Sequence, residues 1–474
     1  MVQRAFERIP ATDMTRRGEV EALREKIEEE KTEDGVNSPP NKFPFFQLPL
    51  ELVCEIFSFA IEANPVFPFI AASVSKDWRA FTLSKPEYWQ CLVLSKKSPQ
   101  RKVPIWIERC KGRITDLRIR EDIGTLQLDD VMKLFSVYPD IFKHVKNIHI
   151  QDHMHRVLTI LLGPLDLWKD VELKELWISS HSQTTNFQIP LSPFILPNRD
   201  SGLTSLSLEW VAVEWDTVFP QLTQLRTLVI RINTLPELPS LLTLFQNNPN
   251  LCKVVLEGTG KWSRPQDLQA CQPSKHDIQL PDLRHLEFTG DINAEALVEC
   301  LSLPRIQHLI LAKNSSLVNV VIDKIDPKPL SLKELNVNLC RLAAPRMADL
   351  LKGFRELEKV ELTHSSVEMG DVVDSLAGTY EENGEVKFNC PHLQSVNFSH
   401  CTYLNGGPIV RLVKSRLTTG DEQEGPRTSN PSEIKEIIID HCPRIDPSVP
   451  AWLRNRVARV SCVYMTKKEI RKIR

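Results

Sequence analysis

The sequence lacks the features by which secreted, membrane-spanning and nucleic-acid-binding proteins are usually recognised. Its longest apolar run, around Val157 to Leu162, is far shorter than the roughly 20 residues of a membrane helix. The first ten residues, MVQRAFERIP, are charged and do not resemble a signal peptide. Lys and Arg number 59 against 61 Asp and Glu, so the net charge of −2 offers no basic excess for nucleic acid. We expect a cytoplasmic or nuclear protein, or one present in both compartments, that binds neither membrane nor nucleic acid.

Metal and disulfide patterns are also lacking. Eleven cysteines are scattered along 474 residues, and none forms a CxxC pair. Without a signal peptide, reduced thiols are expected rather than a disulfide framework. A zinc site needs Cys or His pairs two to five residues apart, and the adjacent pairs His400-Cys401 and His441-Cys442 lack that spacing. We therefore expect no bound metal.

No catalytic motif stands out. The sequence has no HExxH, GxSxG or HRD-type loop, and its Gly258-Thr-Gly-Lys stretch is too short for a phosphate-binding loop. His400 and Cys401 are sequence neighbours at a strand end, where successive side chains point apart, so they do not favour a shared nucleophilic site. We expect no cofactor and no catalytic residue, which indicates that the chain is not an enzyme.

Residues 1–41 form a polar N-terminal segment that is expected to be partly helical or disordered. Val20, Leu23 and Ile27 have the spacing of a single weak heptad seam, which then meets a run of glutamates. Two interpretations stay open: a short dimerising coiled coil, or a solvated helix in a flexible tail. Two prolines in the NSPPN stretch that follows act as a linker.

Large apolar residues become dense over residues 42–95, which predict a small helical domain. Leu52, Ile56 and Phe59 share one helix face at spacings of four and three. A second helical pattern places Val74 and Trp78 on one face. A domain of this size is too small for chemistry alone and apolar enough to need a partner.

Two stretches of this domain resemble the two halves of an F-box. LPLELVCEIFSF, which begins at Leu48, is similar to the opening of that motif. VSKDWRAFTLSKPEYW, which begins at Val74, is similar to its close, in the form common among fungal proteins. The connection between them departs from the pattern because it holds Pro65 and Pro68, so the middle helix is expected to be short or shifted.

The rest of the chain is repetitive. A short L-x-x-L-x-L strand pattern recurs thirteen times between residues 114 and 462, at separations of 22 to 41 residues that are typical of a leucine-rich repeat. Intervening segments such as 294–303 and 347–357 have helical patterns. The expected fold class is an α/β repeat: a small all-α F-box domain, then an irregular leucine-rich-repeat solenoid over 104–466 and a basic tail at 467–474. The middle apolar residues of the strands are Leu117, Ile148, Leu176, Leu206, Leu228, Val254, Leu286, Leu309, Leu335, Val360, Val396, Ile437 and Val460.

Four repeats carry a small residue three positions beyond the strand, where the chain must bend. A side chain there meets buried backbone groups, so these positions are interpreted as structural rather than catalytic. They are Asn314, Cys340, Cys401 and Cys442.

Long inserts interrupt the array at 183–200, 258–281, 378–390 and 417–433. Loops of this length are usually functional or disordered, so each is either a substrate-binding loop or a spacer. The last insert is rich in Gly, Glu, Ser and Pro, which favours disorder. The C-terminal ten residues, MTKKEIRKIR, are either a localisation or phosphate-contact signal or a solvated cap on the last repeat.

In such strands, the residues flanking the last two apolar positions face the inner curve of the array. We call this surface the inner face. Over the units from Leu173 to Ile439 it carries three bases, Arg231, Lys253 and Lys359, and Trp177 as a candidate aromatic anchor. The hypothesis is a partner with a basic or mixed patch; the alternative is that solvated strands simply carry charge. The acids of the inner face are Glu175, Glu209, Glu257, Glu287, Glu334, Glu361, Glu436 and Asp440.

The resemblance implies a substrate-recognition subunit of an SCF-type cullin ubiquitin ligase. Its F-box would bind a Skp-family adaptor and, through it, a cullin, while its repeats bind a protein substrate and tether it near a ubiquitin-charged enzyme. The alternative is a repeat scaffold outside the ligase that uses the F-box-like segment for another partner. The implied adaptor-binding residues are Leu48, Pro49, Leu52, Ile56, Phe57, Val74 and Trp78. The candidate substrate-binding residues are Trp177, Glu209, Glu257, Glu287, Glu361 and Asp440.

Overall fold

The chain is described from a computed structural model in which two compact units can be distinguished. The helical unit comprises Met1–Val93 and Arg101–Ile114, and the repeat unit comprises Leu94–Gln100 and Thr115–Arg474. None of the helices in the described ranges combines the length and hydropathy that a membrane crossing requires. The structure describes residues 48–95, 99–120, 136–152, 171–180, 188–189, 191, 202–259, 278–290, 295–302, 305–313, 331–339, 344–382, 385–417 and 431–464.

Several sequence predictions lie outside the described residues. They are the heptad seam at Val20 to Ile27, the basic tail, Asn314 and Cys340, and most of the inserts at 183–200, 258–281 and 417–433.

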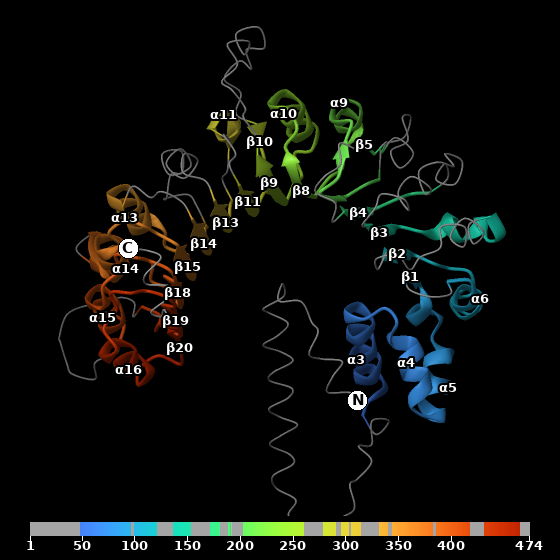
Figure 1. The fold of residues 1–474 in the computed structure, drawn as a ribbon, viewed down its shortest axis with the longest axis horizontal. Helices are drawn as coiled ribbons and strands as arrows, with labels where there is room; N and C mark the ends of the chain where they lie inside the picture. Colours follow the sequence, from blue (N-terminus) through green and yellow to red (C-terminus); the bar gives the residue numbers. More distant parts are fainter. Residues whose placement is uncertain are drawn as a thin grey trace, which may run out of the picture. The chain divides into compact units, whose positions relative to one another are not determined.

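The helical unit contains three consecutive helices, a short 3₁₀ turn and most of a fourth helix (Figure 1). Pro49 precedes the first helix, where its missing N–H costs no hydrogen bond. Ser75 caps the third helix by accepting a hydrogen bond from the backbone N–H of Trp78 at 3.2 Å. The elements are α3 (Leu50–Ala63), α4 (Phe67–Val74), α5 (Lys76–Ser84), η2 (Pro86–Trp89) and α6 (Pro99–Cys110).

The middle helix of the F-box-like segment is short, as its two prolines predict. Asn64 ends α3, and α4 begins three residues later with Pro68 in its first turn. A proline is tolerated at that position because the backbone N–H groups of the first helical turn have no carbonyl acceptor within the helix, so the missing N–H of proline costs no hydrogen bond. The helix then runs for 8 residues and stops before Ser75.

Aromatic side chains form the core of the helical unit. Phe57 is 0% exposed, and Trp89 and Trp106 are also fully buried. The Trp89 indole N–H donates to the Thr82 carbonyl at 3.0 Å, and the Arg109 guanidinium lies 4.3 Å from the centre of the Trp89 ring. Trp106 belongs to α6, which explains why the helical unit extends to residue 114 although the sequence predicts a domain ending at 95 and an array beginning at 104.

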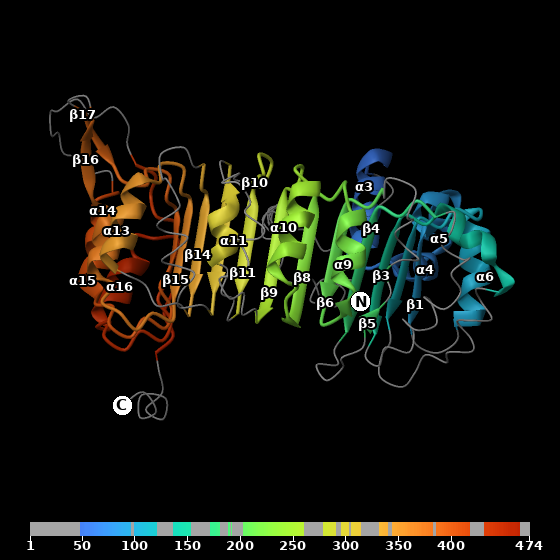
Figure 2. The same cartoon turned by 90° about the horizontal axis from the view of Figure 1, so that it is seen from above.

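A parallel sheet dominates the repeat unit. Its strands pair with their neighbours in chain order, and the helices between them lie on one face of the sheet (Figures 1 and 2). Within the repeat unit the order is β2 (Asp116–Arg120), β3 (Asn147–Asp152), β4 (Glu175–Ser180), β6 (Ser205–Glu209), β8 (Thr227–Thr234), β9 (Lys253–Thr259), β11 (His285–Thr289), β13 (His308–Ala312), β14 (Glu334–Asn338), β15 (Lys359–Thr363), β18 (Ser395–Asn397), β19 (Glu436–Ile438) and β20 (Arg459–Ser461). The remaining strand, β1 (Cys91–Ser95), contains the boundary between the two units at Val93.

The covering elements are short. The predicted helical segments 294–303 and 347–357 are helical in part, as α11 and α13, but residues 301–302 form a strand and α13 ends at Gly353. Three small two-stranded sheets accompany them. The helical elements are η3 (Pro139–His144), α9 (Trp215–Val218), η5 (Phe219–Gln221), α10 (Leu238–Asn247), α11 (Glu295–Cys300), α13 (Ala344–Gly353), α14 (Gly370–Ala377), α15 (Gly406–Lys414) and α16 (Ser448–Arg454). The small sheets pair β5 (Gln188–Ile189) with β7 (Ala212–Val213), β10 (Ile278–Gln279) with β12 (Leu301–Ser302), and β16 (Thr379–Glu382) with β17 (Glu385–Phe388).

The predicted middle apolar residues align in one row across the sheet. Leu117 pairs with Ile148, which pairs with Leu176, and the same register continues strand by strand. Twelve of the thirteen are at most 1% exposed, and Val460 on the last strand is half-buried. Each such burial contributes about 1.5–3 kcal/mol, so this row and the helices packed on it hold the strands together.

A recurring turn ends many of the strands. The residue at this turn has a left-handed backbone, with φ near 56° to 60° at His364, His400 and His441. Its N–H donates to a carbonyl two residues beyond the end of the next strand, at Ser399, Asp440 and Val463 respectively. At Gly290, which occupies the same place, an added Cβ would lie 2.1 Å from the Gly258 carbonyl oxygen. Only glycine therefore fits that approach.

The two cysteines that follow these turns are structural, as predicted. The Cys401 thiol donates to the Leu362 carbonyl at 3.1 Å, and the Cys442 thiol donates to the Phe398 carbonyl at 3.0 Å. Burial raises the pKa of Cys401 to about 11 and that of Cys442 to about 12, so both stay protonated at neutral pH.

Candidate functional site

Apolar side chains lie exposed along one face of α3. Leu52, Ile56 and Phe59 recur at spacings of four and three and are 46%, 41% and 46% exposed. The opposite face buries Val53 and Phe57. The helix therefore carries two apolar stripes, of which one forms the core of the helical unit and the other is partly exposed to solvent.

Phe57 does not lie on the exposed face, although the resemblance implied that it contacts the adaptor. Its ring is central to the core, with centroids 5.2 Å from Trp78, 4.9 Å from Phe81 and 5.7 Å from Tyr88. One residue step turns a helix by about 100°, so Phe57 points inward where Ile56 points outward. A direct contact between Phe57 and a partner is excluded in this conformation; its role is to support the helix.

The other implied adaptor residues differ in exposure. Pro49 is exposed and Leu48 is half-buried at the start of α3. Val74, at the end of α4, is 58% exposed, and Trp78 is half-buried beside Phe57. The structure thus leaves Pro49 and Val74 available to a partner, while Trp78 mainly joins α5 to the core.

The structure adds exposed apolar residues that the motif did not name. Leu50 is 58% exposed on α3, and Ile70 is 46% exposed one turn before Val74 on α4. Leu83 on α5 is 42% exposed. The four-residue spacing of Ile70 and Val74 was the available signal, since it places both on one face of a helix.

The predicted substrate-binding acids lie on the inner face, but most already have partners there. Arg231 lies between Glu209 and Glu257, with nitrogen–oxygen distances of 2.9 and 3.2 Å. These residues occupy paired positions on the adjacent strands β6, β8 and β9. The Arg231 charge offsets both carboxylates in part, which reduces what they offer to a basic partner.

A second such cluster involves Glu361. Lys359 lies 2.6 Å from Glu361 and 2.9 Å from Glu334, and the Asn336 amide donates to Glu361 at 2.7 Å. The His308 hydrogen bond to Glu334, followed by the Lys359 contact, lowers the pKa of Glu334 to about 2 against the opposing effect of burial. Glu334 is therefore ionised at neutral pH, and both acids contact Lys359.

The last two acids of the prediction have local partners as well. Glu287 lies 3.6 Å from His285 on the same strand. Asp440 accepts hydrogen bonds from the Ser461 hydroxyl at 2.8 Å and from the Val463 backbone N–H at 2.7 Å, which ties the end of β19 to β20. Asp440 is thereby part of a strand-end structure.

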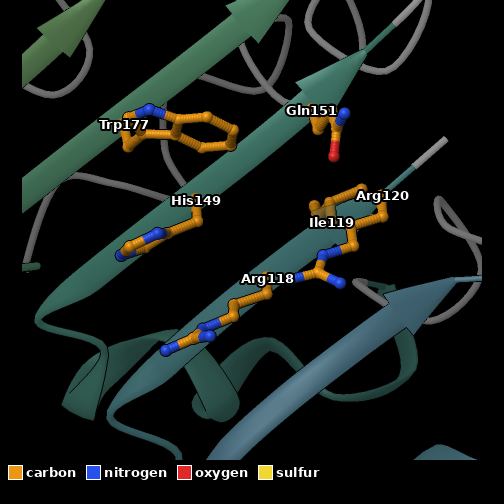
Figure 3. A pocket seen from close by; sticks show the side chains of 6 residues that line it. All are labelled: Arg118, Ile119, Arg120, His149, Gln151 and Trp177. Carbon is orange, nitrogen blue, oxygen red and sulfur yellow. The ribbon is translucent and has the colours of Figure 1, made fainter. Parts of the chain in front are cut away.

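Trp177 lies beside a cavity of about 250 Å³ on β2, β3 and β4 (Figure 3). Ile119 contributes part of the lining. The polar groups come from Arg118, Arg120, His149 and Gln151. The count of inner-face charges from the sequence began at Leu173 and so missed both arginines; extending it to the first strands would have found them.

Among the described residues, the His400–Cys401 pair does not have the arrangement of a nucleophilic site. Cys401 is buried and protonated, as described above, and the His400 ring instead stacks on His364 and His441 at centroid distances of 4.1 and 4.6 Å. No group of three or more His, Cys, Asp or Glu side chains that could hold a metal occurs in the part of the chain that the structure describes.

No protein family matches the sequence, and no curated protein does. Among solved structures, the chain is similar to one in the crystal structure of the Rad7 and Elc1 complex in yeast, at 12% identity, over 89% of this chain and 95% of that chain. The TM-score of this match is 0.41, which is too low to support an argument about fold or function.

Proposed function

We propose that this chain is the substrate-recognition subunit of an SCF-type cullin ubiquitin ligase. The helical unit would bind a Skp-family adaptor, as its resemblance to an F-box implies. The inner face of the repeat unit would bind the substrate protein. This role would require no catalytic residue in the chain, because the ligase would act by tethering a substrate near an enzyme carried by other subunits.

The exposed apolar stripe of α3 is the observation that carries this proposal. Leu52, Ile56 and Phe59 keep more than two fifths of their surfaces in solvent. Large apolar side chains in such a row are typical of a surface that a partner covers. The stripe coincides with the opening half of the F-box-like motif, and Val74 begins the closing half.

The test is recovery of the adaptor with the full-length tagged chain, using two matched variants. Ile56→Glu places a charge in the stripe, and Ile105→Glu places the same charge on α6, at a residue that is 39% exposed against 41% for Ile56. Both sites are solvent-accessible, so both variants are expected to fold. Truncation or charging of a central interface residue costs about 2 kcal/mol or more, so Ile56→Glu should weaken adaptor binding roughly 30-fold.

The control variant decides how a loss is interpreted. Ile105→Glu is expected to recover adaptor and cullin as well as the wild-type chain does. Equal loss in both variants would point to general disruption of the helical unit. If the folded wild-type chain recovers no Skp-family adaptor, the ligase proposal fails and a repeat scaffold with another partner for α3 takes its place.

A further inference from the structure

The first strands of the repeat unit hold two arginines side by side on the inner face. Arg118 and Arg120 are two residues apart on β2, so strand alternation directs both to the same side of the sheet. The register places Arg118 opposite His149 of β3, which is opposite Trp177 of β4. Figure 3 shows these side chains around one cavity, with Gln151 at its far end.

Arg118 and Arg120 differ from Arg231 and Lys359 in their distance from carboxylates. The Arg118 charge acts on Glu175 only by opposing the burial that raises the pKa of that acid. Among the described residues, no ion pair joins Arg118 or Arg120 to a carboxylate, and the Arg118 Nε is buried without a hydrogen-bond partner. Arg231 and Lys359, in contrast, each lie between two glutamates. A buried cationic N–H without an acceptor is unfavourable, so an anion that supplied one would be bound favourably.

Aromatic rings form the wall beside these charges. The rings of His149 and Trp177 lie 5.9 Å apart, and both residues are half-buried. Burial, reinforced by Arg118, lowers the pKa of His149 to about 4, so the ring is neutral at pH 7 and can contact apolar groups. Two acids lie at the start of these strands, and neither lines the cavity. Glu175 approaches the His149 ring at 3.7 Å. Asp116, two residues before Arg118 on β2, accepts hydrogen bonds from the Thr115 hydroxyl at 2.6 Å and the Asn147 amide at 2.7 Å.

We propose that this cavity binds one anionic side chain of a protein segment, either a phosphorylated residue or a carboxylate. Arg118 and Arg120 would hold the oxyanion, because guanidinium groups match carboxylate and phosphate geometry. Trp177 and His149 would contact the apolar stem or a neighbouring side chain. The site rests on the proposed function in one respect only, that the inner face is where a protein partner binds.

The charges around the cavity favour a protein segment over a nucleic acid. Beyond the first strands, the inner face carries carboxylates on β6, β9, β11 and β15. A polyanion lying along the sheet would meet them, whereas a peptide with a single anion and neutral or basic flanks would not. The whole chain also has a net charge of −2.

The test uses the full-length chain on an array of immobilised peptides. One central position is phosphoserine, glutamate, glutamine or lysine, and the randomised flanks contain no acidic residue. The Arg118→Gln/Arg120→Gln double variant removes both cavity charges. The control Lys253→Gln removes an exposed cation from β9 on the same face. We expect wild type and control to retain anionic peptides at least about tenfold better than glutamine peptides, and the double variant to lose this preference.

Each outcome decides one point. Preference for phosphoserine alone identifies a phosphorylated partner, and equal retention of glutamate identifies an acidic one. Equal binding of glutamine peptides, an unchanged preference in the double variant, or the same loss in Lys253→Gln would overturn the proposal. So would a single-stranded oligonucleotide that displaces the peptides. Adaptor recovery is measured on the double variant too and should be unchanged, which separates failure of this site from failure of adaptor docking.

Discussion

Replacing Phe57 by Ala should unfold the helical unit, whereas replacing its neighbour Ile56 by Ala should destabilise it only slightly. Phe57 is 0% exposed and lies within 6 Å of four other aromatic rings, at 5.3, 5.2, 4.9 and 5.7 Å between centroids. Removal of a buried Phe side chain costs about 3–5 kcal/mol. Ile56 is 41% exposed, so its truncation loses only part of the burial energy, roughly 1 kcal/mol.

The size of the unit makes this difference decisive. A domain with so small a core holds about 3–5 kcal/mol in total, which the Phe57→Ala cost matches. Hydrogen exchange read by mass spectrometry in the full chain measures the effect locally, and peptides of the repeat unit serve as an internal reference. Exchange in α3 should rise on the order of 100-fold in Phe57→Ala and less than about tenfold in Ile56→Ala.

Two results would refute this reasoning. Protection of α3 in Phe57→Ala that stays within tenfold of wild type would mean that the aromatic core does not hold the helix. Equal exchange in the two variants would mean that Ile56 is also a core residue, contrary to its exposure. If the expected difference is found, loss of adaptor binding in Phe57→Ala reports unfolding, and only Ile56 variants report the contact.

Two further predictions concern the repeat unit. Because the folded-state pKa of His149 is about 4 against 6.5 for the unperturbed ring, the neutral ring stabilises the fold fully above pH 6.5 and this contribution is lost as the pH falls toward 4. Acidification from pH 7 to 5 should cost about 2 kcal/mol, seen as faster exchange in β3, and His149→Gln should abolish that difference. Arg416 is 2% exposed and its guanidinium donates to three carbonyls at 3.0 Å each, so Arg416→Met should destabilise the β16–β17 hairpin region by about 3 kcal/mol or more. Unchanged urea unfolding of that variant would show that the carbonyls find other donors.

The strands could be predicted from the sequence because their signal is local. Alternation of apolar and polar residues sets which side chains face inward, and the recurrence of the pattern in every repeat fixes a common register. The middle row from Leu117 to Ile437 follows directly from these two facts. The extent of the helical unit could not be predicted in this way. Helix α6 joins that unit through contacts of Trp106 with Phe69 and Trp89, and no local sequence pattern encodes these contacts.

Within the helical unit, the sequence shows that α3 is apolar on more than one side but not which side is covered. The spacing of Val53 and Phe57 is as helical as that of Leu52 and Ile56. Only the aromatic residues supplied by α4, α5 and η2 decide that Phe57 is the core residue. A motif match identifies the residues of such a helix, and packing assigns their roles.

Packing also determines which charges on the inner face are paired, and this changes the charge expected of the partner. A count from the sequence finds more acids than bases, yet neighbouring strands of a sheet lie about 4.8 Å apart, close enough for a base on one strand to contact acids on both sides. Arg231 does so between Glu209 and Glu257, because β6, β8 and β9 share one register. The acid excess is thereby partly neutralised within the sheet. Among the described residues, Arg118 and Arg120 are neighbouring cations of the inner face that lack a carboxylate within ion-pair distance, and they line a cavity. We therefore expect a partner that is selected by charge to contact this pair.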